Sequence, residues 1–170
     1  GIAPHIAAVL EEEKNVRLAE NTPALWQAQF PFPDAASHKY ARGGVTILGG
    51  PPASTGAARL AAMGAARLCG AVTVATVPEA LRYYAGQFTA VMTRVIGDLE
   101  AFEALVREEK QRAVLLAPGC GVSDDTRAAV EVALATKKPV VLDADALGVF
   151  AGSAEALAKA IRGPVVLTPH

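Results

Sequence analysis

The chain has 170 residues, 52% of them hydrophobic and 19% charged, and its 16 Lys and Arg against 17 Asp and Glu give a formal net charge of -1. A chain of this length buries about two-thirds of its unfolded surface, which is enough for one domain, or most of one, with a real core. No apolar run approaches the roughly 18 residues that span a bilayer, and no basic cluster alternates with aromatic residues. We therefore expect neither a membrane nor a nucleic acid as a partner.

The cysteines and the first residues indicate the compartment. Cys69 and Cys120 have no CxxC neighbour and no histidine at metal spacing, so neither a zinc site nor a disulfide framework is expected. The opening residues, GIAPHIAAVLEEEK, lack the charged region and long apolar core of a signal peptide. These features predict a cytoplasmic protein.

Residues 1–36 differ in composition from the rest. An acidic EEEK run precedes NTPALWQAQFPFPDAAS, where Pro23, Pro31 and Pro33 exclude a continuous helix or a central strand. We interpret this segment as a connector, with His5 on its surface.

From Gly44 onward, short β-branched runs alternate with alanine-rich helical segments. The runs predict strands at residues 45–48, 71–77, 90–96, 113–117, 139–143 and 164–168. Because these strands are almost entirely apolar and helical segments separate them, we expect an α/β fold with a doubly wound, mostly parallel sheet between two helical layers.

Two of the helical segments have distinct faces and ends. Residues 98–111 place four apolar side chains on one side, which should cover the sheet: Leu99, Phe102, Leu105 and Val106. Residues 123–138 begin with Ser123 as an N-cap and end with lysines, which we expect in the last helical turn, where they complement the helix dipole.

The loop after the first strand, within GGPPASTGAARLAAMGAARL, is rich in glycine. Ser54 or Thr55 can cap the following helix, whose free N–H groups would suit an anion or a dinucleotide. The spacing is neither GxGxxG nor GxxxxGK[ST]. A tight turn, with Gly and Ala chosen for close helix–sheet packing, explains the pattern equally well.

The loop after the fourth strand, APGCGVSDDT, again places glycines before a helix N-terminus. Gly119 and Gly121 would leave backbone amides exposed, although the loop taken alone favours an ordinary strand-to-helix turn. Cys120 has no histidine near it in sequence, so we interpret it as an inert, partly buried thiol rather than a nucleophile.

Acidic residues follow the fifth strand, in LDADALGVF. Asp143 and Asp145 could coordinate Mg²⁺, orient a hydroxyl or cap the next turn. The last strand runs into LTPH, so His170 should reach the same edge of the sheet. His38 and Lys39, before the first strand, are interpreted as solvated loop residues.

Five motifs, in this order and spacing, resemble those of the NAD(P)H-hydrate dehydratase family: HKYARGGVTILGG, TGAARLAA with GAVTVA, APGCG, VLDADAL and VLTPH. The resemblance covers residues 37–170 and implies a ribokinase-like, three-layer α/β/α fold. It implies nucleotide-dependent dehydration of (S)-NAD(P)HX to NAD(P)H, with ADP or ATP as phosphoryl donor and Mg²⁺. The preceding segment resembles the junction to an NAD(P)HX epimerase domain in bifunctional members, and a homo-oligomer is expected.

The family motifs assign roles by position. Gly56 and Ala57 would lie against the hydrated dinucleotide, Gly119 and Gly121 would supply backbone contacts, and His170 would contact the substrate. An orienting or Mg²⁺-related role falls to the two acids, Asp143 and Asp145.

The sequence departs from the family pattern in two ways. Ala117 and Cys120 replace a glycine and a leucine of the usual GPGLG loop. The family's PGE stretch, lysine loop and GTGD segment, with its expected catalytic aspartate, would follow residue 170, so residues 1–170 alone are not expected to catalyse the reaction.

Two other functions stay open: a ribokinase-like kinase for a vitamin precursor or sugar, and a non-catalytic NAD(P)-binding module. A redox dehydrogenase is disfavoured, because no GxGxxG occurs and no acidic residue has the spacing of a ribose contact.

Overall fold

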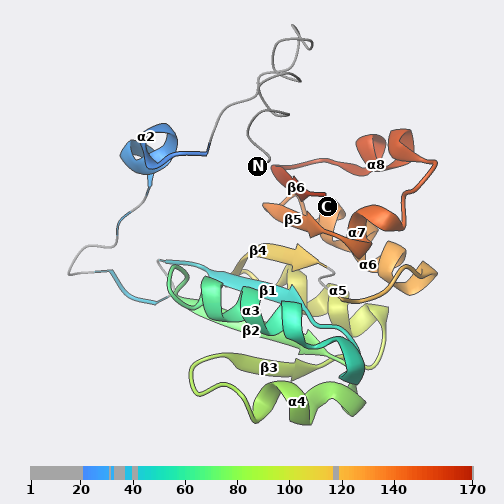
Figure 1. Ribbon diagram of the computed structural model, residues 1–170, viewed down its shortest axis with the longest axis horizontal. Coiled ribbons are helices and arrows are strands. Elements are labelled where there is room, and N and C mark those ends of the chain that lie inside the picture. The colour runs from blue at the N-terminus through green and yellow to red at the C-terminus, as the bar shows by residue number, and fades with distance from the viewer. Residues whose placement is uncertain (1–20, 31, 33–36, 40–41, 117–118, 170) are drawn as a thin grey trace, which may run out of the picture. The chain divides into compact units, whose positions relative to one another are not determined.

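The apolar runs of the sequence form one parallel sheet (Figure 1). The computed structural model describes residues 21–30, 32, 37–39, 42–116 and 119–169, and the chain divides into two compact units, 1–34 and 35–170. The strands of the second unit are β1 Gly44–Leu48, β2 Ala71–Thr76, β3 Met92–Val95, β4 Gln111–Leu116, β5 Val140–Asp143 and β6 Val165–Thr168. All neighbouring strands are parallel. The predicted strands are confirmed, with ends shifted by at most two residues.

The strand order is β3-β2-β1-β4-β5-β6. The chain moves outward from β1 to β2 and β3, returns to β4 on the other side of β1, and continues to β5 and β6. The order therefore reverses between β1 and β4. In open parallel sheets, the loops after the two strands at such a switch point diverge and leave a crevice for a ligand.

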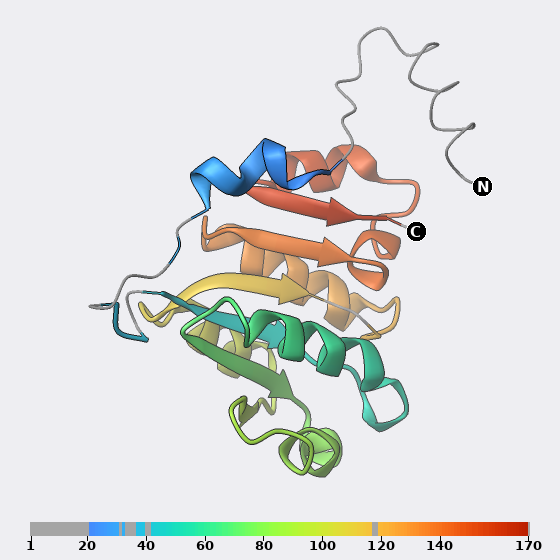
Figure 2. The same ribbon diagram turned by 60° about the vertical axis from the view of Figure 1, so that its left-hand side comes forward.

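Helices cover both faces of the sheet, as Figures 1 and 2 show. One face carries α3 Gly56–Ala65 and α4 Leu81–Ala85, and the other carries α5 Leu99–Arg107, α6 Asp124–Ala135, α7 Asp145–Gly148 and α8 Ala154–Ala160. On the first face, the short side chains of Ala58 and Ala62 pack fully buried near Ile47 and Val74. Alanines four residues apart share one helix face, so α3 can approach the strands closely.

The opposite layer confirms most of the predicted apolar face of α5. Phe102, Leu105 and Val106 are buried. Leu99 is 42% exposed, so its predicted place in the core is wrong. It is the first residue of α5 and borders a cavity rather than the sheet.

The first unit contains a short helix, α2 Pro23–Trp26, followed by a 3₁₀ turn at Gln27–Gln29. Proline suits the first helical position, because that N–H has no partner within the helix. The indole N–H of Trp26 donates to the Asn21 side chain over 3.1 Å. His5, Pro31 and Pro33 lie outside the described residues. In the described part of the chain, no helix is long and apolar enough to cross a membrane.

The ends of α6 agree only in part with the sequence prediction. Ser123 is the N-cap, and its Oγ accepts a hydrogen bond from the Thr126 amide over 3.2 Å, as expected. The helix ends at Ala135, so the lysines lie beyond its last turn. Lys138 instead donates from Nζ to the carbonyl oxygens of Val106 and Glu108, over 2.7 and 2.8 Å, at the end of α5. The lysine thus complements the dipole of a neighbouring helix rather than its own.

Replacing Lys138 by methionine should lower the free energy of unfolding by about 1–3 kcal/mol, because the two carbonyl groups lose a charged hydrogen-bond donor. Lys137→Met is the matched control. This neighbouring lysine is exposed, and its replacement should change stability by less than about 0.5 kcal/mol. Urea unfolding of both variants checks the difference, and equal midpoints would contradict the assigned role of Lys138.

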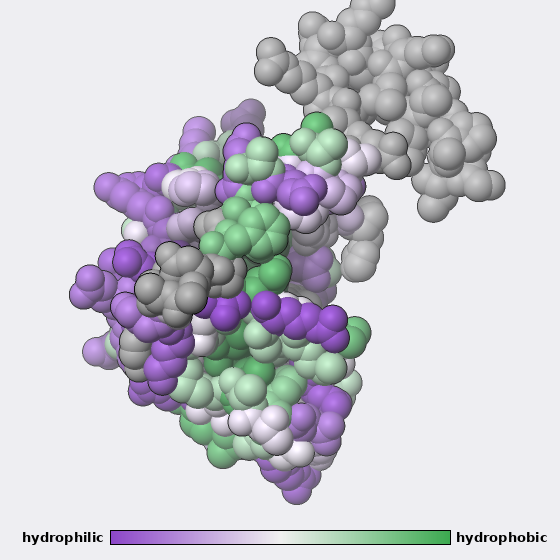
Figure 3. Space-filling view, turned by 90° about the vertical axis from the view of Figure 1, so that its left-hand side faces the viewer, coloured by the Kyte–Doolittle hydropathy of each residue, from purple (hydrophilic) through white to green (hydrophobic). Residues whose placement is uncertain are grey.

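One side of the molecule is rich in apolar side chains. Figure 3 shows hydrophobic side chains in the lower part of this view, at the height of α3, β3 and α4 in Figure 1. The exposed large hydrophobic side chains from or next to these elements include Leu60, Met63, Leu68, Tyr83, Met92 and Val95. Contiguous exposed apolar surface commonly marks a contact with another macromolecule.

Candidate active site

The two glycine-rich loops meet at the switch point of the sheet. A Cβ atom on Gly50, in the loop after β1, would collide with the carbonyl oxygen of Gly119, in the loop after β4. A Cβ on Gly119 would lie 2.7 Å from the carbonyl oxygen of Ser54, and Gly119 also has a φ of +81°. Glycine is therefore required at both positions, and the loops form a backbone surface that we call the glycine rim, residues 49–56 and 119–121.

A buried tyrosine fixes the first of these loops. The hydroxyl of Tyr84, from α4, donates to the carbonyl oxygen of Gly50 over 3.0 Å. A Cβ on Gly49 would lie 2.8 Å from the Tyr84 ring. Burial raises the pKa of Tyr84 to about 12, so the hydroxyl keeps its proton at neutral pH. Sequence reasoning missed this residue, because nothing in LRYYAG indicates a bond to a loop 34 residues earlier.

The two acids after β5 are joined to the neighbouring loops. Asp145 accepts a hydrogen bond from the Gly121 amide through Oδ2 over 2.8 Å, and Asp143 accepts one from the Thr168 hydroxyl through Oδ1 over 2.6 Å. Between them, Ala144 has a φ of 41°, which is strained for a residue with a side chain. The acids therefore link the ends of β4, β5 and β6 into one edge.

These hydrogen bonds limit what Asp143 and Asp145 can do in the two roles considered for them, orienting a group and binding Mg²⁺. Each carboxylate uses one oxygen in a bond within the protein, and the described residues contain no group of three His, Cys, Asp or Glu side chains arranged to hold a metal ion. Mg²⁺ in phosphoryl-transfer sites needs only one or two carboxylates beside the nucleotide phosphates. The geometry fits an ion brought in by a nucleotide and does not fit a resident metal held by the described side chains.

The start of α3 presents small, exposed residues next to the glycine rim. Gly56 and Ala57 are exposed, and a Cβ on Gly56 would meet nothing within 4 Å. The N-cap position belongs to Thr55 rather than Ser54, and the Thr55 side chain makes no capping hydrogen bond. The first amides of α3 are therefore not capped by their own N-cap residue.

Gly121, Ala117 and His170 are the remaining residues that the sequence analysis singled out. Gly121 has a φ of +83° and open space at its Cα, but its amide is taken by Asp145, so its predicted role can involve only its Cα or carbonyl side. Ala117 and His170 lie outside the described residues.

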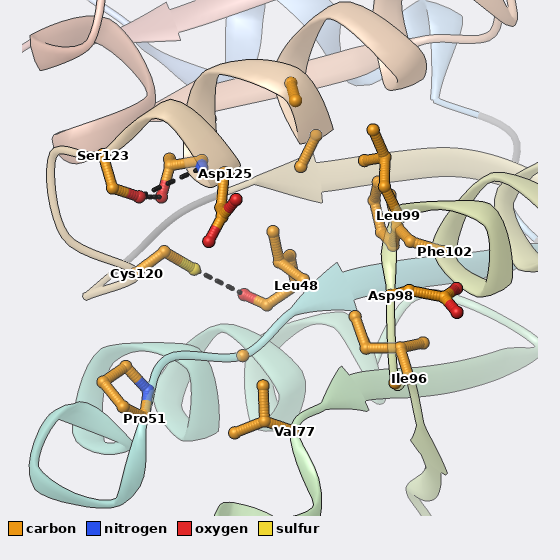
Figure 4. Close-up of a pocket in the computed structure, with 15 residues that line it drawn as sticks. Leu48, Pro51, Val77, Ile96, Asp98, Leu99, Phe102, Cys120, Ser123 and Asp125 are labelled. Carbon is orange, nitrogen blue, oxygen red and sulfur yellow. Dashed lines mark hydrogen bonds between the residues drawn. The ribbon is translucent and has the colours of Figure 1, made fainter.

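A cavity of about 510 Å³ adjoins the glycine rim (Figure 4). Its lining residues come from the carboxyl ends of β1, β2 and β3, from the loop after β4, and from the first two turns of α5 and α6: Leu48, Gly49, Pro51, Val77, Ile96, Gly97, Asp98, Leu99, Phe102, Cys120, Ser123, Asp125, Thr126, Ala128 and Ala129. Cys120 is half-buried, as predicted, and its thiol donates to the Leu48 carbonyl oxygen over 3.6 Å. Among the described residues, the predicted binding residues Gly56, Ala57, Gly119 and Gly121 do not line this cavity. The volume of a cavity depends on how far apart the helices and strands pack, which sequence motifs do not show.

Comparison with known proteins identifies the family. The model of the NAD(P)H-hydrate dehydratase family matches residues 45–170. The bifunctional NAD(P)H-hydrate repair enzyme Nnr of Coxiella burnetii is 35% identical over 149 residues, which are 85% of this chain and 29% of that protein. The ADP-dependent (S)-NAD(P)H-hydrate dehydratase of Bacillus subtilis is 32% identical over 145 residues, which are 85% of this chain and 50% of that protein. The chain thus spans half or less of these relatives.

Solved structures agree with this assignment. The ADP/ATP-dependent NAD(P)H-hydrate dehydratase of Bacillus subtilis, co-crystallised with ATP and Mg²⁺, superposes with a TM-score of 0.68 at 28% identity, over 89% of this chain and 54% of that one. A ribokinase-like protein of Enterococcus faecalis, at 19% identity and a TM-score of 0.64, shares the fold over 92% of this chain and 57% of that one. The expected ribokinase-like α/β fold is therefore confirmed. Since the family match covers most of the chain and the fold agrees with it, this chain belongs to the NAD(P)H-hydrate dehydratase family.

Proposed function

We propose that this chain takes part in nicotinamide nucleotide repair, the nucleotide-dependent dehydration of (S)-NAD(P)HX to NAD(P)H. The observation that carries the proposal is the contact between the loops after β1 and β4. Gly50 and Gly119 let the two backbones meet there without an intervening side chain, at the switch point of the sheet, where a dinucleotide can lie. Relatives that match this chain are named for NAD(P)H-hydrate repair and dehydration.

A kinase fold suits this dehydration. Hydroxide is a poor leaving group, so the donor first transfers a phosphoryl group to the oxygen of the hydrate hydroxyl. The ring nitrogen lone pair then expels phosphate as the C–O bond breaks, and loss of a proton from the adjacent ring carbon restores the dihydropyridine. Positioning and electrostatic stabilisation are the protein's main contributions to such a transfer.

The residues of this chain would hold the dinucleotide in place. Gly56 and Ala57 leave room for it at the start of α3, and the backbone of Gly119 and the open side of Gly121 would contact it. Asp145 would orient the second loop through the Gly121 amide, and His170 would contact the substrate from the end of β6. These roles follow the family motifs.

The donor and partners follow from the relatives. ADP or ATP would supply the phosphoryl group, and Mg²⁺ would enter with it, as the names of the Bacillus subtilis proteins suggest. An NAD(P)HX epimerase domain in the same protein is consistent with the bifunctional relatives. The exposed apolar side chains near α3 support association with a second copy.

The direct test uses the intact natural protein mixed with NADPHX, Mg²⁺ and either ADP or ATP. Absorbance at the reduced-nicotinamide band should recover only when a nucleotide is present, and the effective nucleotide identifies the donor. A folded protein that gives no recovery with either nucleotide would contradict the proposal.

Two glycines of α3 provide a matched test of the substrate position. Gly56 and Gly64 both have open space around them, so leucine at either position should leave the fold intact and modestly favour the helix. Gly56→Leu should raise KM for NADPHX by about tenfold or more, since roughly 1.4 kcal/mol of lost binding corresponds to that factor. Gly64→Leu should leave KM unchanged. Equal KM values in the two variants would contradict the proposal that the substrate lies against the start of α3.

A further inference from the structure

The cavity beside the glycine rim has the size and position of a ligand site. Its volume of about 510 Å³ lies within the range of small-molecule pockets, roughly 300–1,000 Å³. It adjoins the carboxyl ends of β1, β2 and β3, and Gly49 and Pro51 belong both to its wall and to the rim. A molecule lying on the rim can therefore extend into the cavity without a break.

The walls of the cavity are mostly apolar. Val77 and Ile96 follow β2 and β3, Leu99 and Phe102 come from α5, and Ala128 lies on α6. Figure 4 shows Leu99 and Phe102 on the α5 side, and Val77 and Ile96 beside the strand ends, across the space from Cys120 and Asp125. Such walls fit the faces of a flat heterocyclic ring.

The charges around the cavity oppose a phosphate. No Lys, Arg or His is among the lining residues in the described part of the chain, which include two carboxylates, Asp98 and Asp125. Asp98 caps α5 by accepting from the Ala101 amide over 2.8 Å. Both helix N-termini at the cavity thus already have an acidic residue beside them, which offsets their attraction for an anion.

Asp125 differs from Asp98 in having an available carboxylate. It lies in the first turn of α6, is exposed, and makes no hydrogen bond or ion pair with another residue that the structure describes. Figure 4 shows its carboxylate directed toward Cys120 and Leu48, on the cavity side of the helix. A carboxylate in this position accepts hydrogen bonds from hydroxyl groups, as acidic residues do with the ribose of a dinucleotide.

We infer that the cavity binds one nucleoside end of the dinucleotide, its base between the apolar walls and its ribose hydroxyls donating to Asp125, while the phosphates stay outside on the glycine rim. The inference rests on the proposed function, because a dinucleotide substrate is what brings a nucleoside to this edge of the sheet. The end that enters is either adenosine or the reduced nicotinamide riboside, since both share this chemistry.

Calorimetry on the intact natural protein tests the inference with two phosphate-free probes, adenosine and dihydronicotinamide riboside. One of them should bind, and the one that does identifies the end. Asp125→Ala should weaken that binding about tenfold, as expected for a lost hydrogen bond to a charged group. Asp124→Ala is the matched control, because Asp124 is an exposed acid in the same turn that does not line the cavity, and it should change binding less than twofold.

A second pair of variants tests whether the probe occupies the cavity. Ala128→Phe fills the cavity and should abolish binding of the same probe, whereas Ala135→Phe, exposed at the other end of α6, should not affect it. Binding of neither probe, or equal binding to the wild type and Ala128→Phe, would overturn the inference. Turnover of NADPHX is measured separately. If the probe binds in an Asp125-dependent way but NADPHX is not turned over, only the dehydratase proposal is contradicted. If NADPHX is turned over but the variants do not alter probe binding, only the cavity assignment is contradicted.

Discussion

Gly50→Ala is expected to lower kcat/KM for NADPHX by about 100-fold or more, the loss expected when a binding surface moves by about 1 Å. The added Cβ would collide with the Gly119 carbonyl oxygen and would lie 2.9 Å from the Ser54 carbonyl oxygen. Both neighbours are backbone atoms, so no side chain can rotate to make room. The loops after β1 and β4 must separate, and the surface they form together would be lost.

Stability and activity should change by different amounts in this variant. Overpacking of a well-packed site costs about 1–3 kcal/mol, so much of the protein should stay folded. Gly64→Ala is the control, because Gly64 has open space and lies near the C-terminal end of α3, away from the loop after β4. Steady-state kinetics and thermal unfolding on both variants separate the two effects. Wild-type kcat/KM in Gly50→Ala would show that the contact between the loops is not needed for the reaction.

Phe102→Ala should lower the free energy of unfolding by about 3–5 kcal/mol, the usual cost of removing a buried phenyl ring. Phe102 is 1% exposed and belongs to the larger apolar cluster between the sheet and α5 and α6. One side of the ring borders the cavity, so the truncated site has few atoms that could move in to fill the space. This is a large part of the 5–15 kcal/mol that typically stabilises a domain.

Leu99→Ala is the matched control for Phe102→Ala. Leu99 lies one turn earlier on α5 and lines the same cavity, but it is 42% exposed. Its truncation should cost about 1 kcal/mol, because less apolar surface returns to water. Urea unfolding with a common m-value gives both changes, and similar losses for the two variants would contradict the assigned difference in burial.

The sequence determined most of the fold through its hydrophobic pattern. Strand β1 is buried along its whole length. Uniformly apolar runs of this kind, separated by helical segments, can bury the side chains on both faces only in a parallel sheet that helices cover on both sides. Ser123 was predictable as a helix cap because capping is a local interaction between residues three positions apart. The position of the acids after β5 was also predictable, since residues that end a parallel strand lie at the carboxyl-end edge of the sheet.

Only the tertiary structure decided which partner each of these residues has. Lys138 stabilises α5 rather than its own helix, Tyr84 holds the Gly50 carbonyl, and Gly121 donates to Asp145. Each bond joins residues 24 to 34 positions apart or spans separate elements, and no local periodicity or propensity encodes such a pairing. The cavity belongs to the same class of feature, because its volume depends on how far α5 and α6 stand from the ends of three strands. Local sequence fixes the elements and their order, whereas packing across the sheet fixes the distances between the groups that would perform the chemistry.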